Sequence, residues 1–212
     1  MPVRAVIFDF GGVILTSPFE AFARYEAENG LPAGLLRRLN ATNPDDNAWA
    51  RLERSEVDLA GFAELFAAEA RSAGHAVDGM GVLALLGGDL RPAMVEALRR
   101  CHERLKTAML TNNFVPTPEA GEGLSRTGPM AEVLALFDVI VESSRTGLRK
   151  PDPAIYRLVC AELGVEPSEA VFIDDLGVNL KPARALGMTT IKLVDPDEAI
   201  GELEAAVGFP LR

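Results

Sequence analysis

Short apolar runs that end in polar residues recur along the chain and predict buried strands. The first run extends from Val3 to Phe8 and stops at Asp9, which Gly11 and Gly12 follow. Similar runs lie at residues 107–110, 138–141, 170–173 and 190–194. Short apolar runs bounded by turn residues are typical of strands that are buried on both faces.

Helical patterns separate the later runs. Apolar residues follow a helical period over 92–105, 153–163 and 196–207, and a shorter helix leads to Gly187. Asp152 and Pro153 are residue types favoured at the N-cap and at the first helical position. Because crossovers of this length join parallel strands with right-handed connections, the pattern predicts an α/β fold with a Rossmann-like parallel sheet.

The stretch between the first two strands is helical and much longer than a crossover needs. Helices are expected at 19–29, at 33–40 and from 59 onward, where Asp58 is a candidate N-cap. We therefore predict an inserted all-helical cap at 17–87 and an α/β core at 1–16 and 88–212. Aromatic residues supply apolar surface to the cap, and Trp49, which fits no helical stripe, is a candidate to face the cleft.

The predicted strands end in residues with chemical function. These are Asp9, Thr111-Asn112, Glu142-Ser143 and Asp174-Asp175. Any one of them could serve only to cap a turn. Since the carboxyl ends of parallel strands lie along one edge of the sheet, where ligands bind in open α/β folds, we expect all four groups to converge.

Three carboxylates brought together repel one another and require a cation. Oxygen ligands favour Mg²⁺, which binds through one or two carboxylates plus the phosphate of a substrate. Zinc is disfavoured, because the two histidines, His75 and His102, are remote in sequence from these strand ends. Carboxylates, a lysine, a hydroxyl and Mg²⁺ are the groups needed for phosphoryl transfer through an aspartyl-phosphate.

The composition of the chain limits the classes of binding partner that we expect. The chain has 21 basic and 31 acidic residues and a formal net charge of −10, so neither nucleic acid nor an anionic membrane surface is an expected partner. Cys101 and Cys160 lie in helical patterns and are expected to be buried free thiols.

Because the sequence shows no signal peptide and no membrane-spanning run, we expect a cytoplasmic protein. Residues 114–129 are expected to form a surface loop beside the site.

Four ordered segments resemble the motifs of the haloacid dehalogenase (HAD) superfamily. They are Phe8–Val13, Leu110–Asn113, Gly147–Pro151 and Ile173–Asn179. The resemblance covers essentially the whole chain and implies a HAD core with a helical cap. It is strongest in the later half, which is similar to HAD domains that belong to larger proteins with kinase-like and acyl-CoA dehydrogenase parts.

The resemblance implies a role for each matching residue of the substrate site. Asp9 would be the nucleophile and also a metal ligand. Thr111 and the backbone of Asn112 would hold a phosphate oxygen, and Gly12 would lie against the substrate. Lys150 would neutralise charge between the nucleophile and the phosphate.

The resemblance also implies a metal shell. Asp175 and the backbone carbonyl of Gly11 would bind Mg²⁺ together with the nucleophile. Asp174 and Asn179 would order the residues around the ion, although Asp174 could instead cap a helix or pair with Lys150.

Gly11 departs from the pattern of the family. Most phosphatases of this family carry a second Asp there, whose side chain protonates the leaving group; such a group is typically worth roughly 10²- to 10⁴-fold in rate. A small phosphorylated substrate could therefore be hydrolysed slowly. Alternatively, the domain could bind rather than catalyse and associate with kinase-like or acyl-CoA dehydrogenase proteins. A metal-independent dehalogenase is the third hypothesis, and the oligomeric state stays open.

Overall fold

The protein is described by a computed structural model that covers residues 2–85, 87–113 and 128–212. Its elements follow one another in the order β1 (Ala5–Phe8), η1 (Phe10–Ile14), α1 (Phe19–Glu28), α2 (Leu35–Ala41), α3 (Ala48–Glu53), α4 (Leu59–Ser72), α5 (Gly79–Ala84), α6 (Pro92–His102), β2 (Lys106–Thr111), α7 (Gly128–Leu134), β3 (Val139–Glu142), α8 (Ser143–Thr146), α9 (Pro153–Leu163), η3 (Pro167–Glu169), β4 (Ala170–Asp174), α10 (Gly177–Ala185), β5 (Thr189–Lys192) and α11 (Pro196–Val207).

Five parallel strands form one sheet in the order β3-β2-β1-β4-β5. The central strand β1 pairs with both neighbours, so that Phe8 lies opposite Met109 of β2 and Ile173 of β4. All strands run in one direction, and their carboxyl ends therefore lie along one edge. The predicted α/β fold with a Rossmann-like parallel sheet is confirmed.

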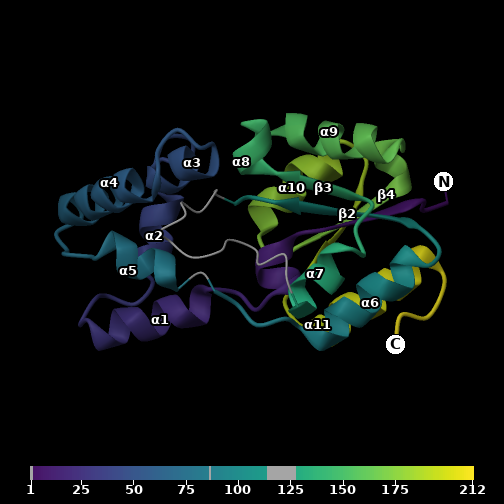
Figure 1. Ribbon diagram of the computed structural model, residues 1–212, viewed down its shortest axis with the longest axis horizontal. Helices are drawn as coiled ribbons and strands as arrows, with labels where there is room; N and C mark the ends of the chain where they lie inside the picture. The colour runs from purple at the N-terminus through teal and green to yellow at the C-terminus, as the bar shows by residue number, and fades with distance from the viewer. Residues whose placement is uncertain (1, 86, 114–127) are drawn as a thin grey trace.

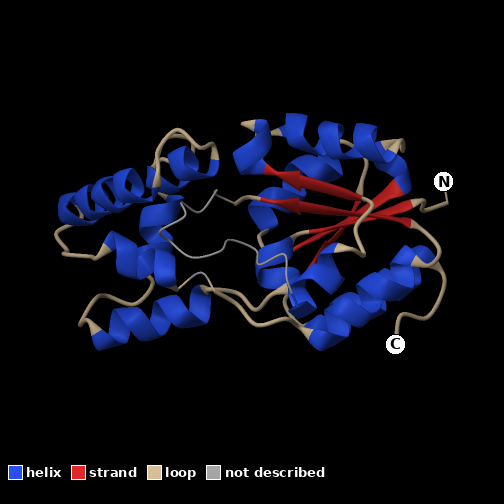
Figure 2. Cartoon of the chain, viewed as in Figure 1, coloured by secondary structure: helices blue, strands red, loops and turns tan. Residues whose placement is uncertain are grey.

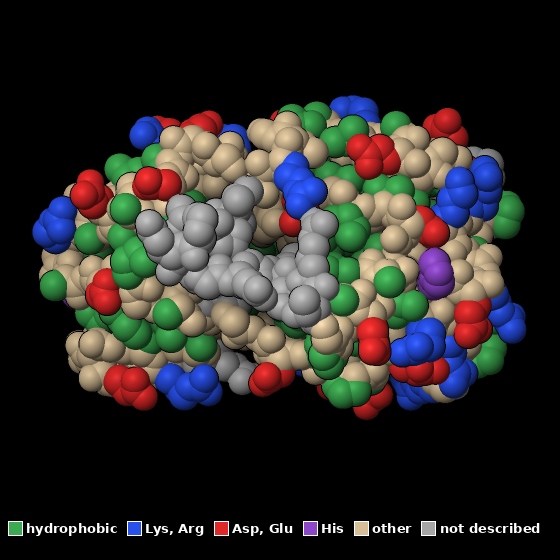
Figure 3. Space-filling view, in the orientation of Figure 1, with side chains coloured by type: hydrophobic (Ala, Val, Ile, Leu, Met, Phe, Trp, Pro, Cys, Tyr) green, Lys and Arg blue, Asp and Glu red, His purple; other side chains and the backbone are tan. Residues whose placement is uncertain are grey.

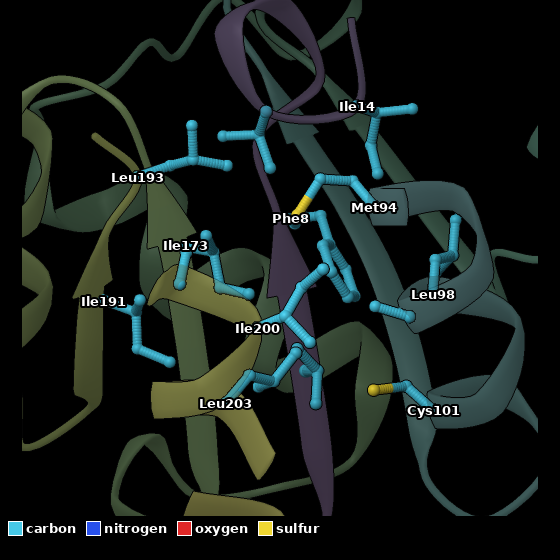
Figure 4. Packing of buried hydrophobic residues seen from close by; sticks show 14 of the residues in the cluster. Phe8, Ile14, Met94, Leu98, Cys101, Ile173, Ile191, Leu193, Ile200 and Leu203 are labelled. Carbon is cyan, nitrogen blue, oxygen red and sulfur yellow. The ribbon is translucent and has the colours of Figure 1, made fainter. Parts of the chain in front are cut away.

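Both faces of the sheet are covered by helices, and this explains why β1 is apolar at every position. Val6 and Phe8 belong to one apolar cluster with residues of α6 and α11, such as Leu98 and Leu203 (Figure 4). The alternate residues of β1 pack on the other face against α9 and α10. Because side chains alternate along a strand, a strand between two helical layers carries apolar residues throughout.

Helices α1 to α5 lie apart from the sheet and surround an apolar cluster of their own (Figures 1 and 2). Two chain segments connect them to the sheet and pair side by side. Leu15 and Leu90 form an antiparallel bridge, and Thr16 N–H donates to the carbonyl of Asp89 at 2.9 Å. This arrangement agrees with an inserted helical cap, whose limits of 17–87 stay a prediction.

Four short helices, α3, α5, α7 and α8, were not expected from the sequence. Trp49 lies in α3, is 6% exposed and packs against Phe62 with ring centroids 4.6 Å apart. The hypothesis that Trp49 faces the cleft is therefore wrong, because the ring fills the core of the cap. The surface loop was expected at residues 114–129. Residues 114–127 of it lie outside the described part of the chain, and residues 128 and 129 are the first two residues of α7.

Several other expectations concern the surface and the thiols. Cys101 and Cys160 are buried and free, as predicted. On the face shown in Figure 3, basic side chains are interspersed with acidic ones. Within the described ranges, the helices are too short or too polar for any of them to cross a lipid bilayer.

Candidate active site

Asp9 directly follows β1 at the carboxyl edge of the sheet. Its Oδ1 accepts a hydrogen bond from the N–H of Phe10 at 2.7 Å and lies 2.8 Å from Nζ of Lys150. Burial raises the pKa of Asp9 well above its usual value; Lys150 opposes this shift, and the charges of Asp174 and Asp175 add to it. A nearby positive charge would therefore favour the ionised carboxylate.

Lys150 is buried between two carboxylates. Its Nζ lies 2.8 Å from Asp9 and 2.7 Å from Asp174. Burial lowers the pKa of Lys150, but the charges of Asp174 and Asp9 outweigh burial and leave this pKa raised. The side-chain amide of Asn112 fixes the lysine backbone, because it donates to the Lys150 carbonyl at 3.0 Å and accepts from its N–H at 2.8 Å. The ammonium group is thus held charged beside Asp9.

Asp174, the last residue of β4, is fully buried and already engaged by the protein. Its Oδ1 accepts from the Leu176 N–H at 2.8 Å, and the Asn179 amide lies 3.0 Å from both of its oxygens. Tyr156 holds Asn179 in turn, since its hydroxyl donates to the Asn179 carbonyl at 2.7 Å. The 2.7 Å contact of its Oδ2 with Nζ of Lys150 agrees with the alternative in which Asp174 pairs with Lys150.

Asp175 approaches the chain at Gly12, where a side chain would clash with it. Gly12 has a φ of 83°, and a Cβ there would lie 2.9 Å from Oδ1 of Asp175 and nearer still to Oδ2. Any side chain at this position would displace the carboxylate. Burial, with a further contribution from Asp174 and against the effect of Lys150, raises the pKa of Asp175 to about 6.

The carboxylates of Asp9, Asp174 and Asp175 each offer an oxygen within 4.8 Å of the others. With the ammonium of Lys150, the cluster has a formal charge of −2, which matches one divalent cation. The donors are oxygens, and oxygen donors suit Mg²⁺ better than zinc. The residues present therefore fit a magnesium ion, and the expected convergence of these strand ends is confirmed.

The other strand ends lie along the same edge. Thr111 pairs in register with Glu142, and the Thr111 hydroxyl donates a long hydrogen bond of 3.5 Å to the Asn112 carbonyl. Glu142 is engaged elsewhere: its Oε1 accepts from the Asn113 amide at 2.6 Å, and its Oε2 pairs with Arg145 at 2.7 Å. The edge thus divides into a group around Asp9 and a supporting network around Asn113.

Gly11 differs from Gly12 in conformation. Its φ of −70° and ψ of 128° are accessible to any residue. Apart from the two adjacent residues, the described part of the chain places no atom within 4 Å of a Cβ built at this position. Gly11 is also exposed to solvent. The absence of a side chain at residue 11 is therefore not imposed by space or by the backbone.

Some contacts at the site were not foreseen from the sequence. Tyr156 lies within the apolar stripe of α9, where a buried hydroxyl needs a partner, so its role as a hydrogen-bond donor could have been inferred. The Ser17 hydroxyl is buried beside Asp175 and lowers the pKa of that carboxyl. An ion pair between Glu53 and Arg149 joins the cap to the segment before the lysine. The Ser17 contact and the Glu53–Arg149 pair could not be predicted from the sequence, because both depend on how the cap docks on the core.

Comparison with known proteins agrees with this geometry. The family model of haloacid dehalogenase-like hydrolases matches residues 3–187. The chain belongs to this family. Acyl-CoA dehydrogenase family member 10 of Mus musculus is 38% identical over 98% of the chain, which spans only 19% of that relative's length.

In two further comparisons the similarity extends over most of this chain and most of the other protein. Phosphatase MT3486 of Mycobacterium tuberculosis is 30% identical over 89% of the chain and 86% of its own length. A HAD-family enzyme from Bacteroides thetaiotaomicron, solved with magnesium and inorganic phosphate, has a TM-score of 0.59 and 20% identity, over 90% of this chain and 93% of that one. The second similarity shows the fold alone, and the first extends the sequence relationship to a protein of similar length.

Proposed function

We propose that this HAD-family hydrolase is a Mg²⁺-dependent phosphohydrolase that acts on a small phosphorylated metabolite through an aspartyl-phosphate on Asp9. The observation that carries the proposal is the buried contact of Lys150 with Asp9, with Asp175 close enough to share a cation with Asp9. The similarity to a phosphatase of comparable length supports the same reaction class.

In the proposed first step, an oxygen of Asp9 attacks the phosphorus atom, a new O–P bond forms, and the bond to the leaving group breaks. Lys150 favours the ionised form of Asp9 and orients its carboxylate through their 2.8 Å contact. Thr111, the backbone of Asn112 and Gly12 would contact the phosphate oxygens. When bound, the magnesium ion would supply charge neutralisation, held by Asp9, Asp175 and the Gly11 carbonyl.

In the second step, water attacks the phosphorus atom of the aspartyl-phosphate, releases phosphate and restores the carboxylate of Asp9. Because residue 11 carries no side chain, the leaving group of the first step would take its proton from solvent or from a residue of the cap. Leaving groups that depart as weakly basic anions need no such proton. We therefore propose slow turnover of ordinary phosphate esters and faster turnover of esters or anhydrides with acidic leaving groups.

Two features favour a second candidate, a binding module of low activity. The usual general acid is replaced by Gly11, and the mouse acyl-CoA dehydrogenase relative is about five times as long as this chain, so that the matching region is one part of a larger protein. In that case the domain would associate with kinase-like or acyl-CoA dehydrogenase proteins and would bind a phosphorylated ligand without hydrolysing it.

Phosphate release from a panel of phosphorylated metabolites, with and without Mg²⁺, tests the proposal. We expect turnover that requires Mg²⁺ and that Asp9→Asn abolishes while the variant remains folded. Tight Mg²⁺ binding without turnover on any substrate would favour the binding module. Activity retained in Asp9→Asn would exclude the covalent mechanism.

Turnover in ¹⁸O-labelled water separates the phosphatase from a dehalogenase. Water that attacks phosphorus places the label in the released phosphate, whereas water that attacks the carbonyl carbon of an alkyl-aspartyl ester places it in Asp9. We expect labelled phosphate and an unlabelled peptide containing Asp9. Label in that peptide, with halide release in the absence of metal, would establish the dehalogenase instead.

A further inference from the structure

A partly buried ion pair joins the cap to the segment that carries Lys150. Nε of Arg149, in the loop between α8 and α9, lies 2.6 Å from Oε2 of Glu53, the last residue of α3. A second group of the same guanidinium, Nη1, donates to the carbonyl of Pro44 at 2.7 Å. Arg149 of the core is therefore bound by two separate segments of the cap.

This pair differs from the ion pairs inside the cap. The side chains of Arg149 and Glu53 are 17% and 15% exposed, whereas those of Arg54 and Glu56, which make a contact of the same 2.6 Å length, are 23% and 48% exposed. Exposed pairs contribute little, but removing one member of a buried pair leaves an uncompensated charge in a poorly solvated place. The Glu53–Arg149 contact is therefore sensitive to the loss of either partner alone.

The surrounding contacts place this pair at the docking point of the cap. Helices α3 and α8 lie side by side (Figure 1), and the Ser55 hydroxyl donates to the Ser144 carbonyl at 3.0 Å. A cleft of about 390 Å³ next to the pair is lined by Asp45 and Arg54 of the cap and by residues 147–149, 151 and 152 of the core. The junction between cap and core is therefore bordered by a solvent-filled cleft on this side.

The segment of residues 149–150 is held from two sides. From the core, the Asn112 amide makes both backbone hydrogen bonds to Lys150. From the cap, Glu53 and the Pro44 carbonyl hold Arg149. A displacement of the cap that breaks the second set leaves the backbone of this segment held only from the core. The core contacts among the described residues are the Asn112 amide and the Asp152 N–H, which donates to the Arg149 carbonyl at 2.9 Å.

We propose that Glu53 and Arg149 are positioning residues that couple docking of the cap to the placement of Lys150 beside Asp9. The proposal rests on the proposed function, in which Lys150 supports the nucleophile. With the cap docked as in this structure, the pair fixes the backbone next to the lysine. When the cap departs, both charges become hydrated and the lysine segment is released.

The coupling predicts a specific pattern in a set of variants. Glu53→Gln leaves the Arg149 charge unpaired in the docked state, and Arg149→Met leaves the Glu53 carboxylate unpaired. Each single variant should lower kcat on p-nitrophenyl phosphate by about tenfold, with a smaller change in KM, because undocked molecules hold Lys150 poorly. The double variant leaves neither charge buried, so its kcat should fall by less than the product of the two single losses.

Glu56→Gln is the matched control, because it removes an equally short contact to arginine that stays within the cap. We expect wild-type kinetics from this control. Arg149→Lys keeps the charge opposite Glu53 and should recover part of the kcat lost in Arg149→Met. Single losses that multiply in the double variant, or an equal loss in Glu56→Gln, would overturn the proposal.

Hydrogen exchange provides a readout that does not depend on turnover. The amide of Lys150 is protected by its bond to Asn112, so a peptide spanning 145–152 should exchange faster in Glu53→Gln and in Arg149→Met than in the wild type or the double variant. Unchanged exchange in both single variants would refute the coupling. Faster exchange in the two single variants, with a wild type that shows no phosphatase turnover, would retain the coupling and refute the proposed function instead.

Discussion

Gly11→Asp tests whether a missing proton donor limits the reaction. The described residues leave room for the substitution, because Gly11 has a φ of −70° and ψ of 128° and a Cβ there meets none of their atoms within 4 Å. Replacing glycine where the backbone conformation is ordinary usually stabilises a protein slightly, by about 0.4–1 kcal/mol. A fourth carboxylate near Asp9 and Asp175 opposes this gain. We therefore expect the thermal midpoint to change by only a few degrees.

The effect on catalysis should depend on the leaving group. A positioned general acid contributes roughly 10²- to 10⁴-fold when the leaving group needs a proton. Nearby carboxylates disfavour a further negative charge, so the introduced carboxyl group tends to keep the proton that it must donate. We expect kcat on a hexose phosphate to rise by about 100-fold or more, and kcat on p-nitrophenyl phosphate to change by less than about threefold.

The assay compares the wild type with Gly11→Asp and Gly11→Asn on both substrates at saturating Mg²⁺. The asparagine variant has a side chain of almost the same shape without the acidic proton, so it controls for packing and for altered substrate position. A gain on hexose phosphate in the aspartate variant alone supports the account. If neither variant gains activity while Mg²⁺ affinity and folding are retained, residue 11 does not limit turnover.

The metal site and the two thiols lead to three further predictions. Mg²⁺ should raise the thermal midpoint, since ligand at 100 times its Kd stabilises a fold by about 2.7 kcal/mol; a midpoint that is unaffected by Mg²⁺ in calorimetry would contradict the ion site. Gly12→Ala should weaken Mg²⁺ binding by about tenfold or more in titration calorimetry, because its Cβ displaces Asp175, and unchanged affinity would show that this carboxylate does not bind the ion. Burial raises the pKa of Cys101 to about 12 and that of Cys160 to about 11. Both thiols should therefore resist alkylation by iodoacetamide at a pH of about 8 until the protein is denatured. Rapid labelling of the native protein would contradict their burial.

Much of the core could be predicted because its signals are local. Strands β1, β3 and β4 are short and mostly apolar runs. Helix α9 begins where Asp152 accepts from the Ala154 N–H and Pro153 takes the first position, as the sequence indicates. Helix α11 covers the predicted range of 196–207. In contrast, α3 and α5 are six residues long, which is too short for a helical period to stand out.

The site was predictable to the extent that topology determines it. Parallel strands bring Asp9 and Asp175 to one edge regardless of side-chain detail, so their convergence follows from the order of strands and helices. The contact between Glu53 and Arg149 has no such origin. It depends on the orientation of the cap on the core, which results from many weak packing contacts and leaves no periodic pattern in the sequence.

The most direct test of the central claim is to trap the phosphoryl group on Asp9. The protein is mixed with Mg²⁺ and a substrate with an acidic leaving group, quenched in acid within the first turnover, digested and examined by mass spectrometry. The account predicts a phosphorylated peptide containing Asp9 that disappears in Asp9→Asn and after treatment with hydroxylamine. Turnover during which this peptide stays unmodified, or phosphorylation at another residue, would contradict the account.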